Sequence, residues 1–358
     1  MIIDKDSLLR LVRAKYKSEK WRGVYERYIG RLVERGVPPI LSFRHLADSI
    51  EIAPSQLRSM AFATHLYYRS FEIPKRSGGS RQILAPYPSI DSVQRWIVEY
   101  ILKAAYQEFD TCVTGYVNGR SIVDHVTPHA SAECLVKFDL KDFFPSIRQS
   151  DVTEIFCELG FTLSVSRTLA ALVTVNGSLP QGASTSPILS NIYLRQFDRD
   201  LKTYCSQFGA RYTRYADDMV ISGDTQLLEQ LGSIKSFFTF SGLTLNHAKT
   251  RVYKTKSKVR FVTGLMIEDG KIRLPKAMRR RIRAQCHLFF IAIEQMVSGD
   301  GNWVADTSIK SWRDKEFLLD PTFGDRLVGK LNYWLHIEPT NSFAIEAKSR
   351  ILNRLSII

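Results

Sequence analysis

The sequence lacks any hydrophobic run as long as the roughly 20 apolar residues that a membrane-spanning helix needs. Its opening residues, MIIDKD, are charged from the start, which does not suit a secretory signal. It also lacks paired cysteines. The five that it has are scattered without a CxxC spacing, which argues against a disulfide framework and a zinc site. We therefore expect a cytoplasmic protein whose cysteines are reduced core thiols.

Acidic residues are the other shortage. The chain carries 50 Lys and Arg against 36 Asp and Glu, a net charge of +14. Such a surplus favours polyanionic partners, and nucleic acid is the first candidate because each neutralised phosphate releases counterions. Charge alone does not separate an enzyme from a structural RNA-binding protein. The length of 358 residues leaves room for two or three packed subdomains.

Hydrophobic periodicity predicts an alternation of helical and extended segments. The chain through about Phe71 reads as helices, and Ile73–Ile83 reads as a hairpin that turns at Gly78-Gly79. A buried strand should end at Asp139, and Arg211–Ile221 should form a strand, a turn and a second strand. Further helices are expected at 93–105, 151–173, 186–201, 227–241 and from 275 onward, with extended segments between 259 and 274.

The most informative pattern is a pair of adjacent acids, Asp217 and Asp218, in an apolar and strand-like context. Like charges this close repel each other unless a cation neutralises them. Mg²⁺ prefers carboxylate oxygens, and Asp139 would join the pair if its strand were a neighbour. Three carboxylates can hold two metal ions about 4 Å apart, the arrangement of two-metal phosphoryl transfer.

Four ordered blocks resemble the catalytic blocks of reverse transcriptases. They are Phe138–Ile147, Leu179–Pro187 with Asn191, Tyr215–Asp218 and Gly242–Thr250, and the resemblance covers roughly residues 65 to 345. Within that family the chain is similar to bacterial retron enzymes, because Val262-Thr263-Gly264 matches their VTG triplet. Their Asn-Ala-x-x-His element aligns with His125–His129, where only the final His is kept.

The resemblance implies an α+β fold of the right-hand polymerase type. Fingers would come from the N-terminal helices and the basic hairpin. The palm would be an antiparallel sheet backed by helices, and the thumb would be helical. The expected boundaries are 1–71 for the N-terminal helical region and part of the fingers, 72–274 for fingers and palm, and 275–358 for the thumb.

The resemblance also implies the site residues. Asp139, Asp217 and Asp218 would bind two Mg²⁺ ions, with Mn²⁺ able to substitute, and Lys249 would be the general acid for pyrophosphate. Phe144 would be the steric gate that rejects a 2′-hydroxyl. The residues expected to bind the nucleotide are Lys75, Arg81, Asp142, Phe143, Phe144 and Gln181. Those expected to bind nucleic acid are His129, Val262, Thr263, Gly264, Lys276, Arg279, Arg280 and Arg283.

The last group lies in a strongly basic stretch. Twelve Lys and Arg lie between Arg251 and Arg283, opposed only by Glu268 and Asp269. A run this one-sided is often only a solvated surface, but here it flanks the candidate chemistry, which favours phosphate contact. We therefore expect the helix after Pro275 to follow the minor groove of a duplex.

By the same resemblance, the partners would be dNTPs, a cognate structured non-coding RNA that serves as template and 2′-hydroxyl primer, its branched DNA product, and an effector protein of an anti-phage defence system. No RNase H or nuclease domain is expected. The alternatives are a defence-associated or intron-type reverse transcriptase, an RNA-directed RNA polymerase, and a non-catalytic RNA-binding scaffold with the same fold. Phe144 argues against an RNA product, and the lack of a maturase-like extension argues against the intron type.

Overall fold

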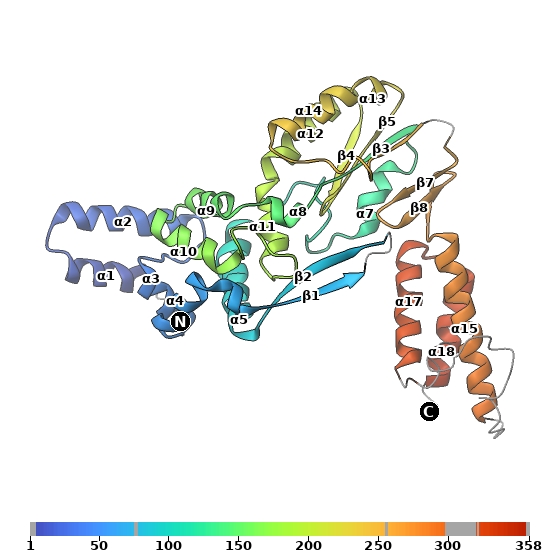
Figure 1. Cartoon of the computed structure of the whole chain (residues 1–358), viewed down its shortest axis with the longest axis horizontal. Coiled ribbons are helices and arrows are strands. Elements are labelled where there is room, and N and C mark those ends of the chain that lie inside the picture. The colour runs from blue at the N-terminus through green and yellow to red at the C-terminus, as the bar shows by residue number, and fades with distance from the viewer. Residues whose placement is uncertain (1–4, 75–77, 255–256, 298–319, 321, 356–358) are drawn as a thin grey trace. The chain divides into compact units, whose positions relative to one another are not determined.

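The computed structural model describes residues 5–74, 78–254, 257–297, 320 and 322–355 (Figure 1). The chain divides into two compact units. The first unit comprises Met1–Ser121 and Val136–Val252, and the second comprises Ile122–Leu135 and Tyr253–Ile358. Each unit therefore contains two separate stretches of chain. The two units are defined by the contacts that residues make within the chain, so they do not test the assignment of fingers, palm and thumb, which stays a prediction.

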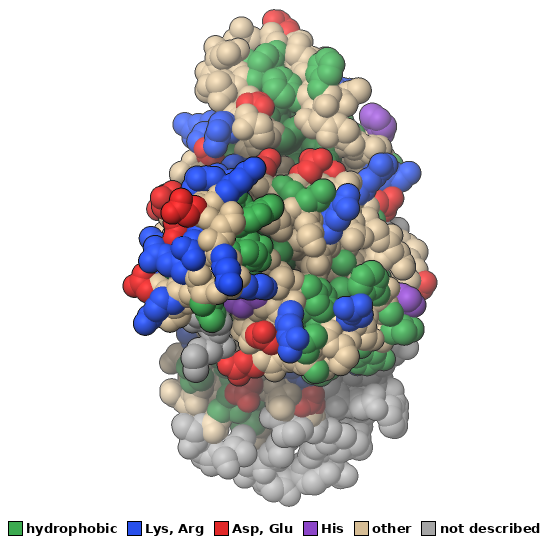
Figure 2. Space-filling model, turned by 90° about the vertical axis from the view of Figure 1, so that its left-hand side faces the viewer, with side chains coloured by type: hydrophobic (Ala, Val, Ile, Leu, Met, Phe, Trp, Pro, Cys, Tyr) green, Lys and Arg blue, Asp and Glu red, His purple; other side chains and the backbone are tan. Residues whose placement is uncertain are grey.

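The N-terminal part of the first unit is helical, as predicted. Leu8 and Val12 of the first helix pack on Ile29 of the second and form a small core of their own. The Ser42 side chain caps the third helix by accepting a hydrogen bond from His45 N at 3.2 Å. Figure 2 shows Lys and Arg side chains across the exposed face at this end of the molecule, with hydrophobic side chains between them. The helices are α1 (Lys5–Lys15), α2 (Glu19–Glu34), α3 (Phe43–Ile50) and α4 (Pro54–Phe62).

The predicted hairpin is present, and it is longer than the sequence indicated. Strands β1 (Tyr68–Pro74) and β2 (Ser80–Pro86) pair antiparallel from Tyr68 opposite Pro86 to Pro74 opposite Ser80. The expectation of helix through Phe71 was therefore wrong for its last residues, where the aromatic Tyr68 and Phe71 favour strand. Gly78 and Gly79 have φ of 90° and 76°, which explains why glycine stands there.

A helical layer connects this hairpin to the main sheet. The helix predicted at 93–105 begins earlier, as α5 (Pro88–Ile97), and continues through the π-helix η2 (Val98–Leu102) into α6 (Lys103–Ala105). The single helix expected at 151–173 is wrong. Gly160, with φ of +99°, ends α9 (Gln149–Glu158) and sends the chain back as α10 (Leu163–Val173), which packs against it.

The main sheet has four strands in the order β4-β5-β3-β6. The β4–β5 pair is antiparallel, as the strand–turn–strand prediction required. The Phe238 ring lies 5.2 Å from Phe138 of the sheet and 5.1 Å from Phe197, so helices α12 and α14 cover one face (Figure 1). The strands are β3 (Cys134–Asp139), β4 (Arg211–Tyr215), β5 (Asp218–Gly223) and β6 (Arg251–Tyr253). The helices are α8 (Phe143–Ser146), α11 (Ser186–Tyr193), α12 (Arg195–Ser206), α13 (Gln226–Glu229) and α14 (Leu231–Phe240).

The second unit combines a small antiparallel sheet with three packed helices. The buried Arg260 side chain donates to the carbonyl oxygens of Ala130 and Ala132 at 2.9 and 2.5 Å, which anchors the 122–135 segment to the sheet. Trp334 is fully buried, and its indole donates to Glu338 at 3.0 Å. The elements are α7 (Ile122–Val126), η3 (Thr127–His129), β7 (Val259–Val262), β8 (Leu265–Glu268), β9 (Lys271–Arg273), α15 (Lys276–Val297), α17 (Phe323–Ile337) and α18 (Ser342–Leu355).

The predicted fold class is confirmed: the chain is α+β, its described strand pairs are antiparallel, and its C-terminal part is helical. Within the described ranges, none of the helices combines the length and the apolar character that crossing a lipid bilayer requires. The five cysteines are free thiols, four of them buried, which confirms the expectation of core thiols.

Candidate active site

The acids from two sequence blocks meet where two neighbouring strands end. Asp139 is the last residue of β3, and Asp217 lies in the turn between β4 and β5. Strand β5 lies beside β3, and Leu140 N donates to the carbonyl oxygen of Asp217 at 3.3 Å. Asp218 begins β5, opposite Tyr215. The predicted convergence of these two blocks is therefore present in the backbone.

The fourth sequence block closes the same site from the other side. Asn246 N donates to the carbonyl oxygen of Asp139 at 2.8 Å, and Lys141 N donates to that of Thr244 at 2.8 Å. These backbone bonds place Lys249 beside the acids. Its Nζ lies 2.8 and 3.0 Å from the two carboxylate oxygens of Asp139.

A second lysine, which the sequence did not single out, neutralises another of the acids. Lys137 Nζ lies 2.8 Å from Asp218 Oδ2, and both side chains are mostly buried. Lys137 precedes Asp139 by two positions on β3, so their side chains leave the strand on the same face. Two of the three carboxylates are therefore held by ammonium groups.

Asp217 has the most perturbed electrostatics of the three. Burial raises the pKa of its carboxyl group, and the negative charges of Asp139 and Asp218 raise it further. Its own backbone amide and the Lys249 ammonium partly offset this increase. The site thus concentrates more negative charge than its two lysines balance.

The donor set fits divalent metal ions in its chemistry. Carboxylate oxygens are the ligands that Mg²⁺ prefers, and the raised pKa of Asp217 indicates a place where additional positive charge is favourable. Across the residues that the structure describes, however, no three side chains of His, Cys, Asp or Glu are grouped so that they hold a metal ion together. A metal ion bound here would replace the ammonium groups of the two lysines as the partner of the Asp139 and Asp218 carboxylates. The role of the three aspartates as metal ligands stays a prediction.

The residues predicted to bind the nucleotide differ in how far they are exposed to solvent. Phe143 is buried, and its ring lies 5.1 Å from that of the half-buried Phe144. Asp142 is exposed, with a left-handed φ of 47°. Arg81 is exposed on β2, whereas Lys75 lies outside the described residues.

Gln181 is joined to the hairpin by its backbone. Its carbonyl oxygen accepts a hydrogen bond from Leu84 N at 2.9 Å. The next residue, Gly182, has φ of +131°, and a Cβ there would lie 2.6 Å from Leu84 O. The glycine therefore permits a close approach between this loop and β2.

Tyr116 is a site residue that the sequence analysis missed. Its ring lies 6.3 Å from that of Phe144. Burial raises the pKa of its phenol, Asp217 raises it further, and Arg81 lowers it. Tyr116 is thus near both the acids and the hairpin. In the sequence, Gly115-Tyr116 stands just before the turn residues Asn118-Gly119. This pattern by itself indicates an ordinary loop, so it did not identify Tyr116 as a site residue.

In the second unit, the structure separates the expected nucleic-acid residues by burial. His129 and Val262 are fully buried, and their predicted contact with nucleic acid stays a prediction. Thr263 and Gly264, with φ of 46° and 83°, form the turn between β7 and β8 and remain accessible.

On α15, the basic residues differ in what they contact. Arg280 is exposed and Arg279 is half-buried. Lys276 forms an ion pair with Glu268 at 3.1 Å. The guanidinium of Arg283 lies 5.0 Å from the Phe343 ring and 5.8 Å from that of Trp334, so this arginine covers the packed helices as well as facing solvent.

Known proteins resemble this chain in sequence and in fold. The family model for reverse transcriptases (RNA-dependent DNA polymerases) matches residues 73–265, a little over half of the chain. The retron Ec86 reverse transcriptase of Escherichia coli is 28% identical over 280 residues, covering 77% of this chain and 86% of that protein. The retron Ec83 reverse transcriptase of Escherichia coli is 32% identical over 241 residues, covering 62% of this chain and 74% of that protein.

A solved structure of apo telomerase from Candida tropicalis is similar with a TM-score of 0.46 and 14% identity, covering 79% of this chain and 62% of that chain. The family match spans both strands that carry the acids, the second and fourth blocks and the hairpin from Ile73. The chain therefore belongs to the reverse transcriptase family, the RNA-directed DNA polymerases, and within it to the bacterial retron type.

Proposed function

We propose that the chain copies a cognate structured non-coding RNA into single-stranded DNA that stays joined to this RNA. The observation that carries the proposal is the contact between Leu140 N and Asp217 O, because it brings Asp139 of β3 beside the Asp217-Asp218 turn. Membership of the reverse transcriptase family supports the reaction class. The similarity to retron enzymes supports the RNA-linked product.

Asp139, Asp217 and Asp218 are the proposed ligands of two Mg²⁺ ions, or of Mn²⁺ in their place. Such ions supply the positive charge that favours deprotonation of the attacking hydroxyl and stabilises the leaving pyrophosphate. Lys249, held beside Asp139 at 2.8 Å, is placed to give a proton to the pyrophosphate. Lys137, 2.8 Å from Asp218, would balance the charge of this carboxylate while no ion is bound.

The remaining residues of the first unit are proposed to select and orient the dNTP. Arg81 on β2 offers a planar fork of donors to the triphosphate, together with Lys75. Phe144 fills the space beneath the sugar and excludes a 2′-hydroxyl, with Asp142 and Phe143 beside it. Gln181 offers an amide next to the same hairpin.

The second unit is proposed to bind the template and primer strands. Thr263 and Gly264 present an accessible turn, and α15 presents Arg280, Arg279 and Arg283. The proposal keeps the expected boundaries: 1–71 for the N-terminal helical region and part of the fingers, 72–274 for fingers and palm, and 275–358 for the thumb. The partners proposed with it are the cognate RNA, its DNA product and an effector protein in anti-phage defence.

Primer extension on an RNA template tests the catalytic part. The double variant Asp217→Asn, Asp218→Asn should lose dNTP incorporation while RNA binding persists, because the carboxylates and not the fold are removed. Asp224→Asn is the matched control, since this exposed acid follows β5 and accepts a hydrogen bond from Gln226 N of the next helix at 2.9 Å. Full incorporation by the double variant would show that the acids are not catalytic.

The product tests the retron part separately. Nucleic acid that copurifies with the protein should contain DNA whose size falls after RNase digestion and again after treatment with an enzyme that cleaves 2′–5′ branches. DNA that is insensitive to both treatments would exclude the RNA-linked product, while leaving RNA-directed DNA synthesis intact.

A further inference from the structure

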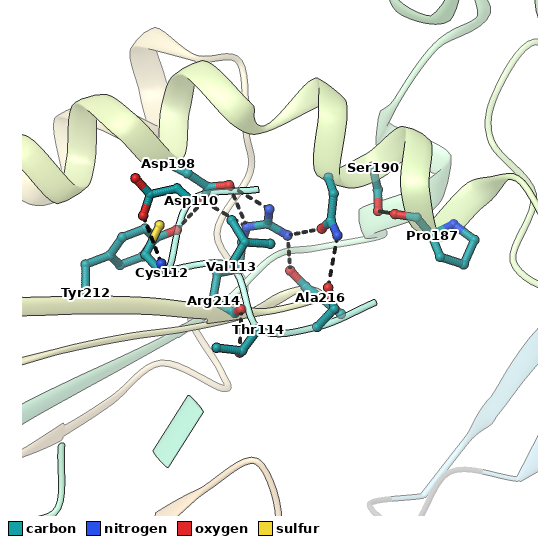
Figure 3. Close-up of polar contacts among 12 residues, drawn as sticks. Asp110, Cys112, Val113, Thr114, Pro187, Ser190, Asp198, Tyr212, Arg214 and Ala216 are labelled. Atoms are coloured by element: carbon teal, nitrogen blue, oxygen red, sulfur yellow. Dashed lines mark hydrogen bonds and ion pairs between the residues drawn. The ribbon is translucent and has the colours of Figure 1, made fainter. Parts of the chain in front are cut away.

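A buried ion pair lies directly behind the catalytic turn. Arg214 of β4 is fully buried, and its guanidinium binds Asp198 of α12 through Nη2 to Oδ2 at 2.6 Å and Nε to Oδ1 at 2.8 Å (Figure 3). Charges are costly to bury unless they are paired with good geometry, and this pair meets that condition. The pair therefore fixes the guanidinium plane relative to α12.

The remaining nitrogen of the same guanidinium, Nη1, contacts the turn between β4 and β5. Arg214 Nη1 donates to the carbonyl oxygen of Ala216 at 3.2 Å (Figure 3). The same nitrogen donates to Asn191 Oδ1 at 3.0 Å. Asn191, buried on α11, uses its amide nitrogen to donate to the carbonyl oxygen of Gly115 at 2.9 Å. One arginine thus joins two helices and the residue that precedes Asp217.

The segment before Gly115 is joined to the turn as well. Arg214 N donates to the carbonyl oxygen of Cys112 at 2.7 Å, and Thr114 N donates to that of Arg214 at 2.8 Å. A Cβ on Gly115 would lie 2.5 Å from Ala216 N, so only glycine allows this approach. The turn is enclosed by backbone on one side and by the guanidinium on the other.

Ala216 needs this enclosure. Its φ of 58° lies in the left-handed region, which a residue with a Cβ avoids unless its surroundings impose it. Asp217 follows directly, so the peptide plane that Arg214 holds also sets the direction in which the Asp217 carboxylate leaves the backbone.

We propose that Arg214 and Asn191 are positioning residues for DNA synthesis, which act by holding the Ala216 peptide and so the carboxylate of Asp217. The inference rests on the proposed catalytic role of Asp217. A carboxylate displaced by about 1 Å lowers the rate of the chemical step by around 100-fold even when substrate still binds.

Two variants disrupt the contacts that hold the Ala216 peptide without removing Asp139, Asp217 or Asp218. Arg214→Lys keeps a cation opposite Asp198 but loses the planar fork, and Asn191→Ala removes the amide while leaving the ion pair untouched. Both should lower the maximal rate of single-nucleotide incorporation by about 100-fold, with little change in the Kd for dNTP or for primer–template. Tyr212→Phe is the matched control, because its hydroxyl donates to the same Asp198 at 2.8 Å on the side away from the turn. It should leave the rate within about threefold.

Hydrogen exchange supplies a readout that does not depend on activity. Peptides covering Arg214–Met219 should exchange faster in Arg214→Lys and Asn191→Ala than in Tyr212→Phe at equal melting temperature. A destabilised core variant remote from the turn, Leu169→Ala in α10, separates positioning from loss of stability. If Leu169→Ala slows incorporation as much as Asn191→Ala at the same melting temperature, the inference fails. It also fails if Asn191→Ala is folded and fully active.

The two proposals fail in different ways. Activity that survives in the Asp217→Asn, Asp218→Asn variant would remove the catalytic assignment. Activity that is lost in that variant but kept in both Arg214→Lys and Asn191→Ala would remove only the positioning role. Should Arg214→Lys not fold, Asn191→Ala decides the question alone, since it leaves the buried charges paired.

Discussion

At the scale of single residues, two lysine side chains explain how three acidic side chains can lie close together. Lys249 and Lys137 approach the acids from different elements, and each places an ammonium 2.8 Å from a carboxylate oxygen. Asp217 receives no such direct pairing among the described contacts, and burial raises the pKa of its carboxyl group. The two lysines therefore have the same chemistry but serve different acids.

Comparing the two lysines tests which of them takes part in proton transfer. Lys249→Met should lower the maximal incorporation rate by about 100-fold, the usual contribution of a general acid. Lys137→Met removes an equally short ion pair and should cause a much smaller loss, because it removes no proton donor for pyrophosphate. Rapid-quench measurements of one incorporation event would decide this. Equal losses would mean that both lysines act only by balancing charge.

The gate assigned to Phe144 is tested by sugar selection. Phe144→Val should raise the efficiency with rNTPs relative to dNTPs, by on the order of 10- to 200-fold, the range over which pocket size discriminates. Phe143→Val removes the same volume from a buried neighbour and should lower the melting temperature. Because Phe143 is assigned to nucleotide binding and not to the gate, its loss should affect dNTPs and rNTPs equally and leave this ratio unchanged. The measurement is kcat/KM for matched dNTP and rNTP pairs. An unchanged ratio in Phe144→Val would assign the gate elsewhere, with Tyr116 as the next candidate because its ring lies 6.3 Å away.

Local sequence identified the acids but not the residues that hold them. Asp139, Asp217 and Asp218 stand out because acids in apolar strands are rare. Arg214 does not stand out, since an arginine in a half-buried strand normally points to solvent. Its partners Asp198 and Asn191 lie on two different helices, and no local pattern predicts that tertiary contact.

At the scale of elements, the loop that carries Gln181 is tied to the basic hairpin. Leu84 N donates to Gln181 O at 2.9 Å, and Gly182 leaves no room for a side chain between loop and strand. Movement of the hairpin and movement of this loop are therefore coupled.

Gly182→Ala tests that coupling. Its Cβ would lie 2.6 Å from Leu84 O, so the loop or β2 must shift, and the Kd for dNTP should rise several-fold. Gly177→Ala is the control, because Gly177 also has positive φ, +78°, but no atom lies within 4 Å of the place that its Cβ would take. Both variants carry backbone strain, about 1 kcal/mol at Gly177 in the left-handed region and more at Gly182, whose φ of +131° lies beyond that region. Only Gly182→Ala should affect the nucleotide. Transient kinetics with varied dNTP would show the difference; similar Kd values in both variants would contradict it.

Element types were predicted well, and element ends less so. The β4–β5 pair and α15 follow the periodic pattern, whereas the 151–173 helix breaks at Gly160. Gly160 with its positive φ and the N-cap Thr162 are local signals of this break, which hydrophobic periodicity alone does not record. Residues 68–71 joined β1 because their partners lie across the hairpin turn. Pairing of this kind depends on residues distant in sequence, which periodicity does not record.

At the scale of the whole molecule, the free thiols report on the integrity of the cores. Burial raises the pKa of Cys205 to about 12 and that of Cys286 to about 11, so both remain thiols, not thiolates, at pH 8. Cys112 and Cys134 are also buried, and Cys157 alone is half-buried. With a thiol reagent at pH 8, we expect at most Cys157 to react quickly in the native protein and all five to react after denaturation. Rapid reaction of several thiols would mean that a core opens readily.

The interleaved order of the two units has a consequence for biosynthesis. Residues 122–135 leave the ribosome long before residue 260, whose arginine anchors them through the carbonyl groups of Ala130 and Ala132. During translation, this short stretch must wait without its partner while more than a hundred further residues are added. Splitting the gene at residue 253 would leave the first unit whole in the N-terminal fragment but would separate the second unit from its residues 122–135. A two-part version of the enzyme would have to supply 122–135 together with the C-terminal fragment.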